Sequence, residues 1–262
     1  MEFCTIASGS SGNSTYIGTE YTKILIDAGV SGKRIQDALG QLGISGEDID
    51  ALFLTHEHID HIQGAGVISR RFHVPIYATE ETWAAIGDSL GKIAPDDKRY
   101  VYPGEVCAVN DICVRPFSIP HDAAEPVGYN VMAEDRKATL ATDIGHVTDE
   151  ICEALADSDI LLLEANHDVE MLKKGGYPRL LKERILGENG HLSNHTAGEL
   201  LSSVMSGRLK HVFLGHLSKE NNTPDLAYGT VERILWEHHI QNGRDLRLDL
   251  AGRSAVGRRA FV

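Results

Sequence analysis

The chain has 262 residues, of which 42% are hydrophobic and 24% charged, ordinary values for a soluble globular protein. Its net charge of −13 argues against a general affinity for nucleic acid. The apolar runs are too short to cross a membrane, no signal peptide is visible, and the four cysteines form no Cys-x-x-Cys pair. We therefore expect a cytoplasmic protein without a disulfide framework, a membrane anchor or an obligate protein partner.

The first part of the chain predicts strands, a small polar loop and a helix. Residues 6–14 form the loop, whose glycines and serines can either bind an anion through successive N–H groups or simply turn the chain. Residues 22–26 predict a strand that ends at Asp27. Residues 31–43 have the apolar spacing of an amphipathic helix.

The densest cluster of chemically active side chains follows the next predicted strand, at residues 51–54. Residues 56–61 have the pattern His-x-His-x-Asp-His, with a glutamate after the first histidine. Imidazole and carboxylate together suit zinc, manganese or iron. A zinc-protease helix needs His-Glu-x-x-His, which this spacing excludes. The pattern therefore predicts a metal site in a loop between a strand and a helix, and chance clustering in a polar loop is the weaker interpretation.

The rest of the chain predicts short strands that alternate with helices. Strands are expected at residues 74–78, 106–109, 112–119, 127–132, 138–141, 160–163, 211–214 and 246–250. Helices are expected at residues 80–90, 148–156, 194–205 and 224–240, with further helical segments on both sides of Gly175 and Gly176. This order indicates a layered α/β fold in two halves.

Further candidate site residues stand where predicted strands end or a helix begins. They are Asp27, His121, Asp143, Glu164, His191 and His216. Taken singly, each could be a turn former, a surface histidine or a structural carboxylate. Side chains at strand ends can also face the same end of a sheet as the histidine cluster, which would make them parts of one site.

Five of these motifs occur in the order seen in the metallo-β-lactamase superfamily, which the chain resembles over nearly its whole length. They are Asp27, the cluster at 56–61, His121, Asp143 and His216. The resemblance implies an α/β fold, the αββα four-layer sandwich with two mixed sheets flanked by helices. It also implies two divalent ions per chain, Zn²⁺ or Mn²⁺ with iron as a further candidate. One ion would be held by His56, His58, His121 and Asp143, and the other by Asp60, His61, Asp143 and His216. Asp27 would brace the histidine loop from outside the ligand set.

The catalytic residues implied are Asp60, Glu164 and His191. Glu164 and His191 resemble the Glu/His pair of the nuclease branch of the superfamily, which includes tRNase Z. In that pair the histidine protonates a leaving alkoxide and the glutamate orients it. A thioester releases a thiolate and needs no such acid. Many β-lactamases of this fold carry cysteine at the position of Asp143, so a β-lactam substrate is disfavoured as well.

The spacing of the motifs limits the domain organisation. His121 and Asp143 are only 22 positions apart, which leaves no room for the arm of a tRNase Z, and Asp143 and His191 are 48 positions apart, which excludes a β-CASP insertion. We expect one hydrolase domain over residues 1–262. The segments 9–14, 164–172, 190–194 and 215–222 resemble the WalJ (YycJ) group of bacterial proteins, which are described as 5′-to-3′ DNA exonucleases linked to DNA repair.

The sequence thus favours a metal-dependent DNA exonuclease. The alternative is a small-molecule phosphodiesterase acting on cyclic phosphates or nucleotides, which the acidic net charge favours. A non-catalytic binding protein is disfavoured because the ligand set is intact. A polymer requires phosphate contacts beyond the reacting one, and the basic segment 173–184 lies between Glu164 and His191. The candidate substrate-binding residues are Ser10, Asn13, His167, Arg179, Lys182, Arg184 and Asn222.

Overall fold

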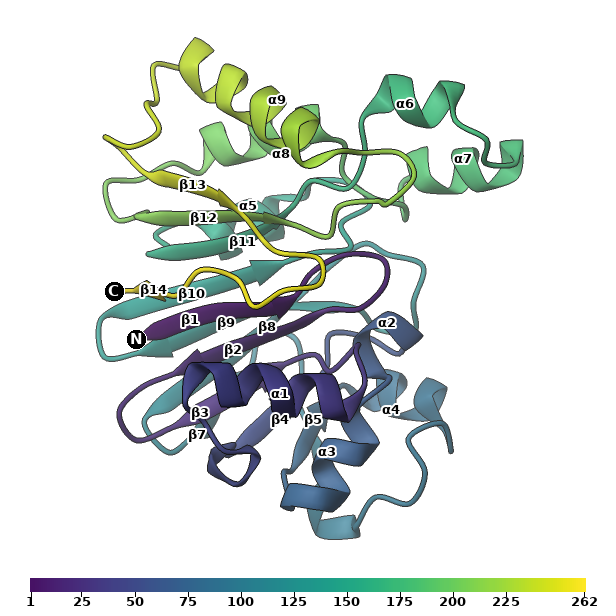
Figure 1. Cartoon of the computed structure of the whole chain (residues 1–262), viewed down its shortest axis with the longest axis vertical. Coiled ribbons are helices and arrows are strands. Elements are labelled where there is room, and N and C mark those ends of the chain that lie inside the picture. The colour runs from purple at the N-terminus through teal and green to yellow at the C-terminus, as the bar shows by residue number, and fades with distance from the viewer.

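The computed structural model describes residues 1–262 and contains two seven-stranded sheets that lie face to face (Figure 1). The first sheet has the order β14-β1-β2-β3-β4-β5-β6. Its strands are β14 (Ala260–Phe261), β1 (Glu2–Ala7), β2 (Ser14–Gly18), β3 (Lys23–Ile26), β4 (Ala51–Phe53), β5 (Ile76–Ala78) and β6 (Lys98–Tyr100). Strands β3 to β6 are parallel, and the other neighbours are antiparallel.

The second sheet has the order β13-β12-β11-β10-β9-β8-β7. Its strands are β13 (Arg247–Leu250), β12 (His211–Gly215), β11 (Ile160–Glu164), β10 (Arg136–Ala141), β9 (Val127–Ala133), β8 (Ile112–Ser118) and β7 (Cys107–Val109). Strands β10 to β13 are parallel, and β7 to β10 pair antiparallel. Because β8 lies two antiparallel steps from β10, the carboxyl ends of β8, β10, β11 and β12 lie at the same edge.

Helices cover the outer face of each sheet (Figure 1). Those beside the first sheet are α1 (Gly32–Leu42), α2 (Ile59–Ile62), α3 (Ala65–Phe72) and α4 (Glu80–Ile86), with the short 3₁₀ turns η1 (Gly46–Asp48) and η2 (Pro95–Asp97). Those on the side of the second sheet are α5 (Asp149–Leu155), α6 (Val169–Lys174), α7 (Arg179–Leu186), α8 (Asn194–Ser203) and α9 (Pro224–Glu237). Helices α6 and α7 project from the body at the upper right of Figure 1.

Three apolar layers hold these elements together. A cluster of 20 buried residues lies between the sheets, where the rings of Phe3 and Phe213 stack with centroids 5.3 Å apart. Clusters of 24 and 23 buried residues lie between each sheet and its helices. The Tyr129 hydroxyl donates to the Leu54 carbonyl at 2.7 Å, a hydrogen bond that links the two sheets. Three apolar layers between four structural layers confirm the expected αββα sandwich.

Local chemistry explains where the helices begin. A serine or threonine side chain accepts a backbone N–H at the start of α1, α4, α5, α8 and α9. These hydroxyls satisfy N–H groups that have no partner within the helix. In α1 the apolar side chains of Ile35, Leu39 and Leu42 are buried, as the amphipathic spacing predicted.

Three details differ from the sequence-based expectations. Residues 59–62 form α2, where a loop was expected; a single turn is too short to show helical periodicity. Strands β6 and β14 were not expected; β14 follows β13 in the chain and pairs with β1 in the first sheet. Both β6 and β14 are short edge strands with little sequence signal. None of the helices has the length and apolar character that crossing a bilayer requires.

Candidate metal centre and active site

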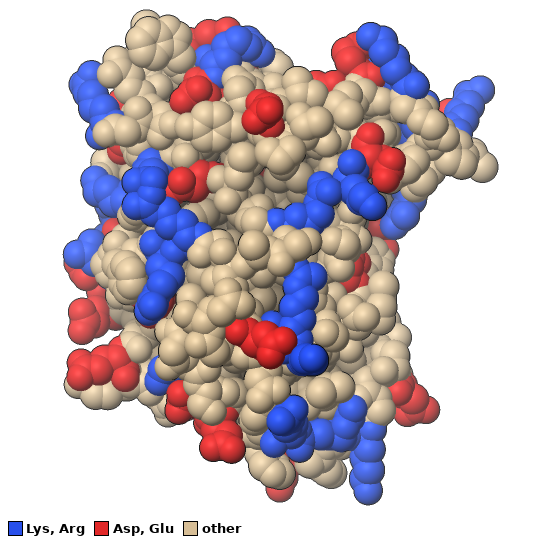
Figure 2. Space-filling model, in the orientation of Figure 1, with Lys and Arg blue, Asp and Glu red and all other residues tan.

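The candidate site lies at the carboxyl ends of strands from both sheets. His56 and His58 follow β4, Asp60 and His61 lie in α2, and His121, Asp143 and His216 follow β8, β10 and β12. Ligands bind at this edge in many α/β proteins because the connections that leave the strands carry variable polar side chains. The right-hand outline of the molecule in Figure 2 is hollowed between the α6–α7 projection and the lower half.

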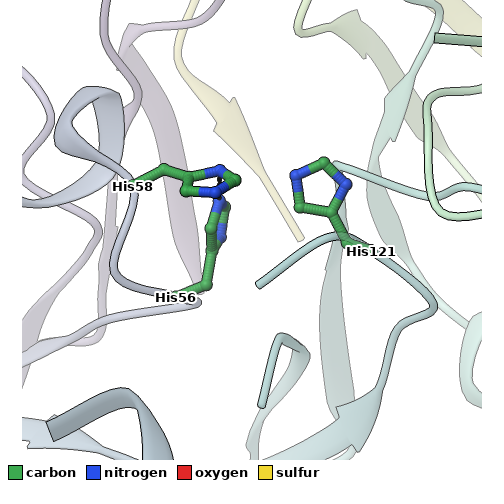
Figure 3. Close-up of side chains that lie close together, drawn as sticks. All are labelled: His56, His58 and His121. Atoms are coloured by element: carbon green, nitrogen blue, oxygen red, sulfur yellow. Dashed lines mark hydrogen bonds between the residues drawn. The ribbon is translucent and has the colours of Figure 1, made fainter. Parts of the chain in front are cut away.

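Three histidines form the first group of candidate ligands. The nitrogens of His56, His58 and His121 that could bind a metal lie within 4.8 Å of one another. The Nε2 atom of His56 is 3.0 Å from Nδ1 of His58, and the His121 ring faces both from the second sheet (Figure 3). This convergence brings nitrogens from two sheets to one point, as a shared cation requires.

The second group consists of Asp60, His61 and His216. Asp60 Oδ2 lies 3.7 Å from Nε2 of His61 and 3.7 Å from Nε2 of His216. Tetrahedral ligands at bond lengths of about 2.0–2.1 Å stand about 3.3–3.4 Å apart. The observed separations are therefore close to those of atoms that share one metal ion.

Asp143 lies between the two groups. Its Oδ2 is 3.4 Å from Nε2 of His61, and its Oδ1 is 3.8 Å from Nε2 of His121. One carboxylate therefore reaches both groups with different oxygens, which is the arrangement of a bridging ligand.

The electrostatics of the cluster favour a bound cation. Burial and the neighbouring histidines hold the pKa of His56 well below its usual value, which keeps the imidazole neutral, the form that binds metals. For His61, burial lowers the pKa, but Asp27 and Asp143 outweigh it and raise the pKa to about 9. The carboxylates thus stabilise positive charge beside His61, and a bound metal ion would supply that charge.

Unpartnered polar atoms provide an independent test of the fit. Oδ2 of Asp143 and Nε2 of His216 are buried and form no hydrogen bond. Buried polar atoms without partners are rare because each destabilises the fold. Both atoms point into the ligand cluster, and coordination would satisfy them. The donor set and its geometry are those of a divalent-metal site.

Outer residues fix the orientation of the candidate ligands. Asp27 Oδ2 lies 2.7 Å from Nδ1 of His61, and the Thr55 hydroxyl contacts both Asp27, at 3.0 Å, and Nδ1 of His56. His121 donates from Nδ1 to the Gly190 carbonyl at 3.2 Å. These bonds engage the Nδ1 atoms of His56, His61 and His121, so that their Nε2 atoms face the candidate metal centre, a role that such outer contacts commonly have.

Glu164 connects the candidate acid to a candidate ligand. Its Oε1 accepts from Nδ1 of His191 at 2.8 Å and from Nδ1 of His216 at 2.9 Å. Its Oε2 accepts from the backbone N–H groups of Ile144 and Leu192. Burial would raise the pKa of Glu164, but the two histidines lower it well below its ordinary value. Because Glu164 engages Nδ1 of His191, whose side chain is 18% exposed, Nε2 is the ring nitrogen that Glu164 leaves unbonded.

Three residues of the site have a left-handed backbone. The φ angles are 60° at Asp27, 61° at Asp143 and 53° at His216, each just after a strand. This region is unfavourable for residues with a Cβ atom, and non-glycine examples concentrate at functional sites.

The small polar loop places its two candidate residues differently. Ser10 is exposed at the loop tip. Asn13 is buried, and its Oδ1 accepts from the Gly9 N–H at 2.8 Å while its Nδ2 lies 3.0 Å from Nε2 of His61. Asn13 thus anchors the loop beside the candidate metal ligands.

Asn222 has a structural environment instead of the substrate contact expected from the sequence. Its Nδ2 donates to the carbonyl oxygens of Ala165 and Asn166 and to Oδ1 of Asn194, and its Oδ1 accepts from Asn194 Nδ2 and the Thr223 N–H. The side chain is buried and its polar atoms are fully used. We therefore assign it to the scaffold that holds the segments carrying Glu164 and His216.

The basic segment lies on the α6–α7 projection, but its charges are partly paired. Arg179 is 90% exposed and pairs with Glu183 at 2.7 Å, and Lys182 donates to the Lys173 carbonyl. Arg184 pairs with Asp122. Figure 2 shows acidic and basic side chains interspersed over the visible face rather than one large basic patch.

Sequence reasoning missed two residues that the structure brings into the site. Thr55 supports Asp27 and His56, and Asp122 Oδ1 lies 3.3 Å from Nε2 of His121 while its other oxygen pairs with Arg184. The available signal was adjacency, since each directly precedes or follows a candidate ligand. His167, expected at the cleft wall, lies buried beside His191 along a shared cavity.

Comparisons with known proteins agree with this architecture. The family described as "Beta-lactamase superfamily domain" matches residues 22–214, which include every candidate ligand except His216. The chain is 41% identical over 250 residues to Exodeoxyribonuclease WalJ of Streptococcus pneumoniae, covering 95% of this chain and 93% of that protein. It is 40% identical over 237 residues to Exodeoxyribonuclease YycJ of Bacillus anthracis, covering 90% of each.

A solved structure shares the fold at low sequence identity. Zinc-bound PqqB from Methylobacterium extorquens superposes with a TM-score of 0.74 at 17% identity and covers 100% of both chains. The sandwich described above is therefore shared over the full length of both chains.

Proposed function

The chain belongs to the metallo-β-lactamase superfamily, and from this premise we propose that it is a metal-dependent exonuclease that hydrolyses DNA. Relatives about 40% identical over most of the chain are named exodeoxyribonucleases, which supports nucleic acid as the substrate. The proposal includes 5′-to-3′ polarity, a role in DNA repair, a cytoplasmic location, and a single hydrolase domain over residues 1–262.

The observation that carries the proposal is the pairing of Glu164 with His191 beside the ligand cluster. Hydrolysis of a phosphodiester breaks a P–O bond and releases an alkoxide, a poor leaving group that needs a proton. His191 Nδ1 is held 2.8 Å from Glu164 Oε1, so Nε2 is the atom that would deliver this proton. A hydrolase of activated esters would need no such pair.

The metal ligands proposed are the two groups joined by Asp143. His56, His58, His121 and Asp143 would hold one ion, and Asp60, His61, Asp143 and His216 the other, with Zn²⁺ or Mn²⁺ as the candidates. Bound there, such ions would activate water as a nucleophile and would neutralise charge on the phosphoryl oxygens. Asp27, Thr55 and Glu164 orient the ligating histidines through their other ring nitrogens.

An assay panel tests the proposal. Purified protein is loaded with Mn²⁺ or Zn²⁺ and offered end-labelled duplex DNA, single-stranded DNA, RNA and a cyclic nucleotide. We expect stepwise release of nucleotides from a free 5′ end of DNA. A circular DNA of the same sequence should resist digestion, because an exonuclease needs an end.

Two results would change the assignment. Hydrolysis of the cyclic nucleotide without degradation of DNA would favour the small-molecule phosphodiesterase, the alternative that the net charge of −13 supports. Cleavage of circular DNA would indicate an endonuclease instead.

A further inference from the structure

A cavity of about 390 Å³ opens beside the candidate acid, and none of the candidate metal ligands lines it. It is lined by Gly145, His146, Val147, His167, Val169, Leu186, His191, Leu192, Ser193 and Thr196. His191 is thus the residue that the cavity and the active site share. The volume suits a small organic group, since ligand pockets in proteins commonly measure about 300–1,000 Å³.

His167 is the anomalous residue of this cavity. It is 1% exposed, and neither ring nitrogen has a hydrogen-bond partner. A buried histidine with two unsatisfied nitrogens destabilises the fold unless something else contacts it. Burial lowers the pKa of His167 to about 4, so the neutral ring offers one donor and one acceptor.

The remaining walls combine apolar and hydroxyl groups. Val147, Val169, Leu186 and Leu192 supply apolar surface, and Ser193 and Thr196 supply hydroxyls at the start of α8. A flat ring with apolar faces and polar edges matches such a lining. Leu186 lies on the projecting α7, lines the cavity and is 46% exposed, so its side chain forms part of the solvent side of the cavity.

The position of the cavity identifies which part of a substrate it would receive. His191 is proposed to protonate the oxygen that leaves phosphorus, so the fragment attached to that oxygen lies on the His191 side. In a nucleic acid this fragment is a nucleotide carrying a base. A pocket that receives one base beside the candidate acid would also explain why an enzyme removes terminal residues rather than cutting within a strand.

We propose that this cavity is a nucleobase-binding subsite for the leaving nucleotide, with His167 contacting the polar edge of the base. The inference rests on the proposed exonuclease function and specifies its substrate contact. A neutral histidine accepts or donates according to the partner, so the subsite would tolerate any base. Stacking against the apolar walls would contribute most of the selectivity over a sugar without a base.

The test compares DNA strands that carry either normal nucleotides or abasic tetrahydrofuran residues at both ends, which makes the result independent of polarity. The metal-loaded wild type is compared with His167→Leu, Leu186→Trp and the control His195→Ala, an exposed residue of α8 outside the cavity. We expect the wild type and the control to prefer the normal ends by about tenfold or more in kcat/KM. Both cavity variants should reduce that preference towards one.

Equal rates on both ends in the wild type, or a preference that both cavity variants retain, would overturn the subsite. A second measurement distinguishes failure of the nucleobase subsite from failure of the exonuclease proposal. Deoxyadenosine 5′-monophosphate and deoxyribose 5-phosphate are titrated into the metal-loaded proteins. If no DNA is degraded, tighter wild-type binding of the nucleotide that both cavity variants lose still supports the subsite, and equal binding of the two ligands refutes it.

Discussion

The two halves of the molecule contribute to one site in different ways. The first sheet delivers His56, His58, Asp60 and His61 from six consecutive residues, so their mutual positions depend on one loop and one helical turn. The second sheet delivers its side chains from the ends of separate strands, and their positions depend on strand order. We call the first set, from residues 56–61, the local half of the site, and the second set, from separate strand ends, the distributed half. One change in a single loop can alter the geometry of the local half, whereas the geometry of the distributed half is lost when any of several connections shifts.

Removing the carboxylate proposed to bridge the two ions should have the largest effect, because Asp143 lies between the two ligand groups. We expect Asp143→Ala to lose both metal ions and nearly all hydrolysis, since its oxygens reach both ligand groups. His58→Ala, a change confined to the local half, should retain metal at the second group. Elemental analysis and activity measured together provide the check; a fully occupied Asp143→Ala protein would refute the bridging role.

The next effect concerns the acid of the distributed half. His191→Ala should keep both metals but slow hydrolysis of DNA by roughly 10²–10⁴-fold. The loss should be much smaller for a p-nitrophenyl phosphodiester, whose leaving group needs no proton. Equal losses on the two substrates would remove His191 from this role. His195→Ala, a nearby exposed change on α8, is the matched control.

A smaller effect should come from the scaffold that supports the distributed half. Asn222→Ala leaves Asn194 and two backbone carbonyls without their donors, so we expect a loss of about 1–3 kcal/mol in the free energy of unfolding. Denaturant titration measures it. Because the two side chains bond to each other, the double variant Asn194→Ala/Asn222→Ala should lose less than the sum of the single changes. Strict additivity would show that the two side chains do not support each other. Unchanged stability with an altered KM would favour the substrate contact that the sequence suggested for Asn222.

The smallest effect concerns the basic segment. Arg184 should be left intact, because it pairs with Asp122 beside His121 and its loss would disturb a candidate ligand. Arg179→Ala/Lys182→Ala should flatten the salt dependence of DNA binding by about two in the logarithmic slope, about one per lost phosphate contact. The matched control is Arg233→Ala/Lys210→Ala, which removes a similar ion pair and a similar carbonyl contact elsewhere. If the Arg179→Ala/Lys182→Ala variant and the wild type have identical slopes, the basic segment 173–184 is a solvent-exposed face that does not contact DNA.

The same contrast explains what the sequence could predict. The candidate ligands at 56–61 are recognisable in the sequence because they are adjacent, and strand periodicity placed Asp27, His121, Asp143 and His216 at strand ends. The pairings of Asn222 with Asn194 and of Arg184 with Asp122 join residues 28 and 62 positions apart. Such contacts depend on the order of strands and the path of loops, which local patterns do not encode. Glu164 was assigned to His191, but its bond to His216 needed the folded chain.

The left-handed backbone at Asp27, Asp143 and His216 has a consequence for how this molecule would change under selection. Glycine adopts that conformation without the penalty that a Cβ atom brings. A laboratory population selected only for folding and expression would therefore gain from glycine at these positions, because natural proteins are rarely at their stability optimum. Without selection for catalysis, substitutions should therefore accumulate in the candidate metal centre before they affect the αββα sandwich.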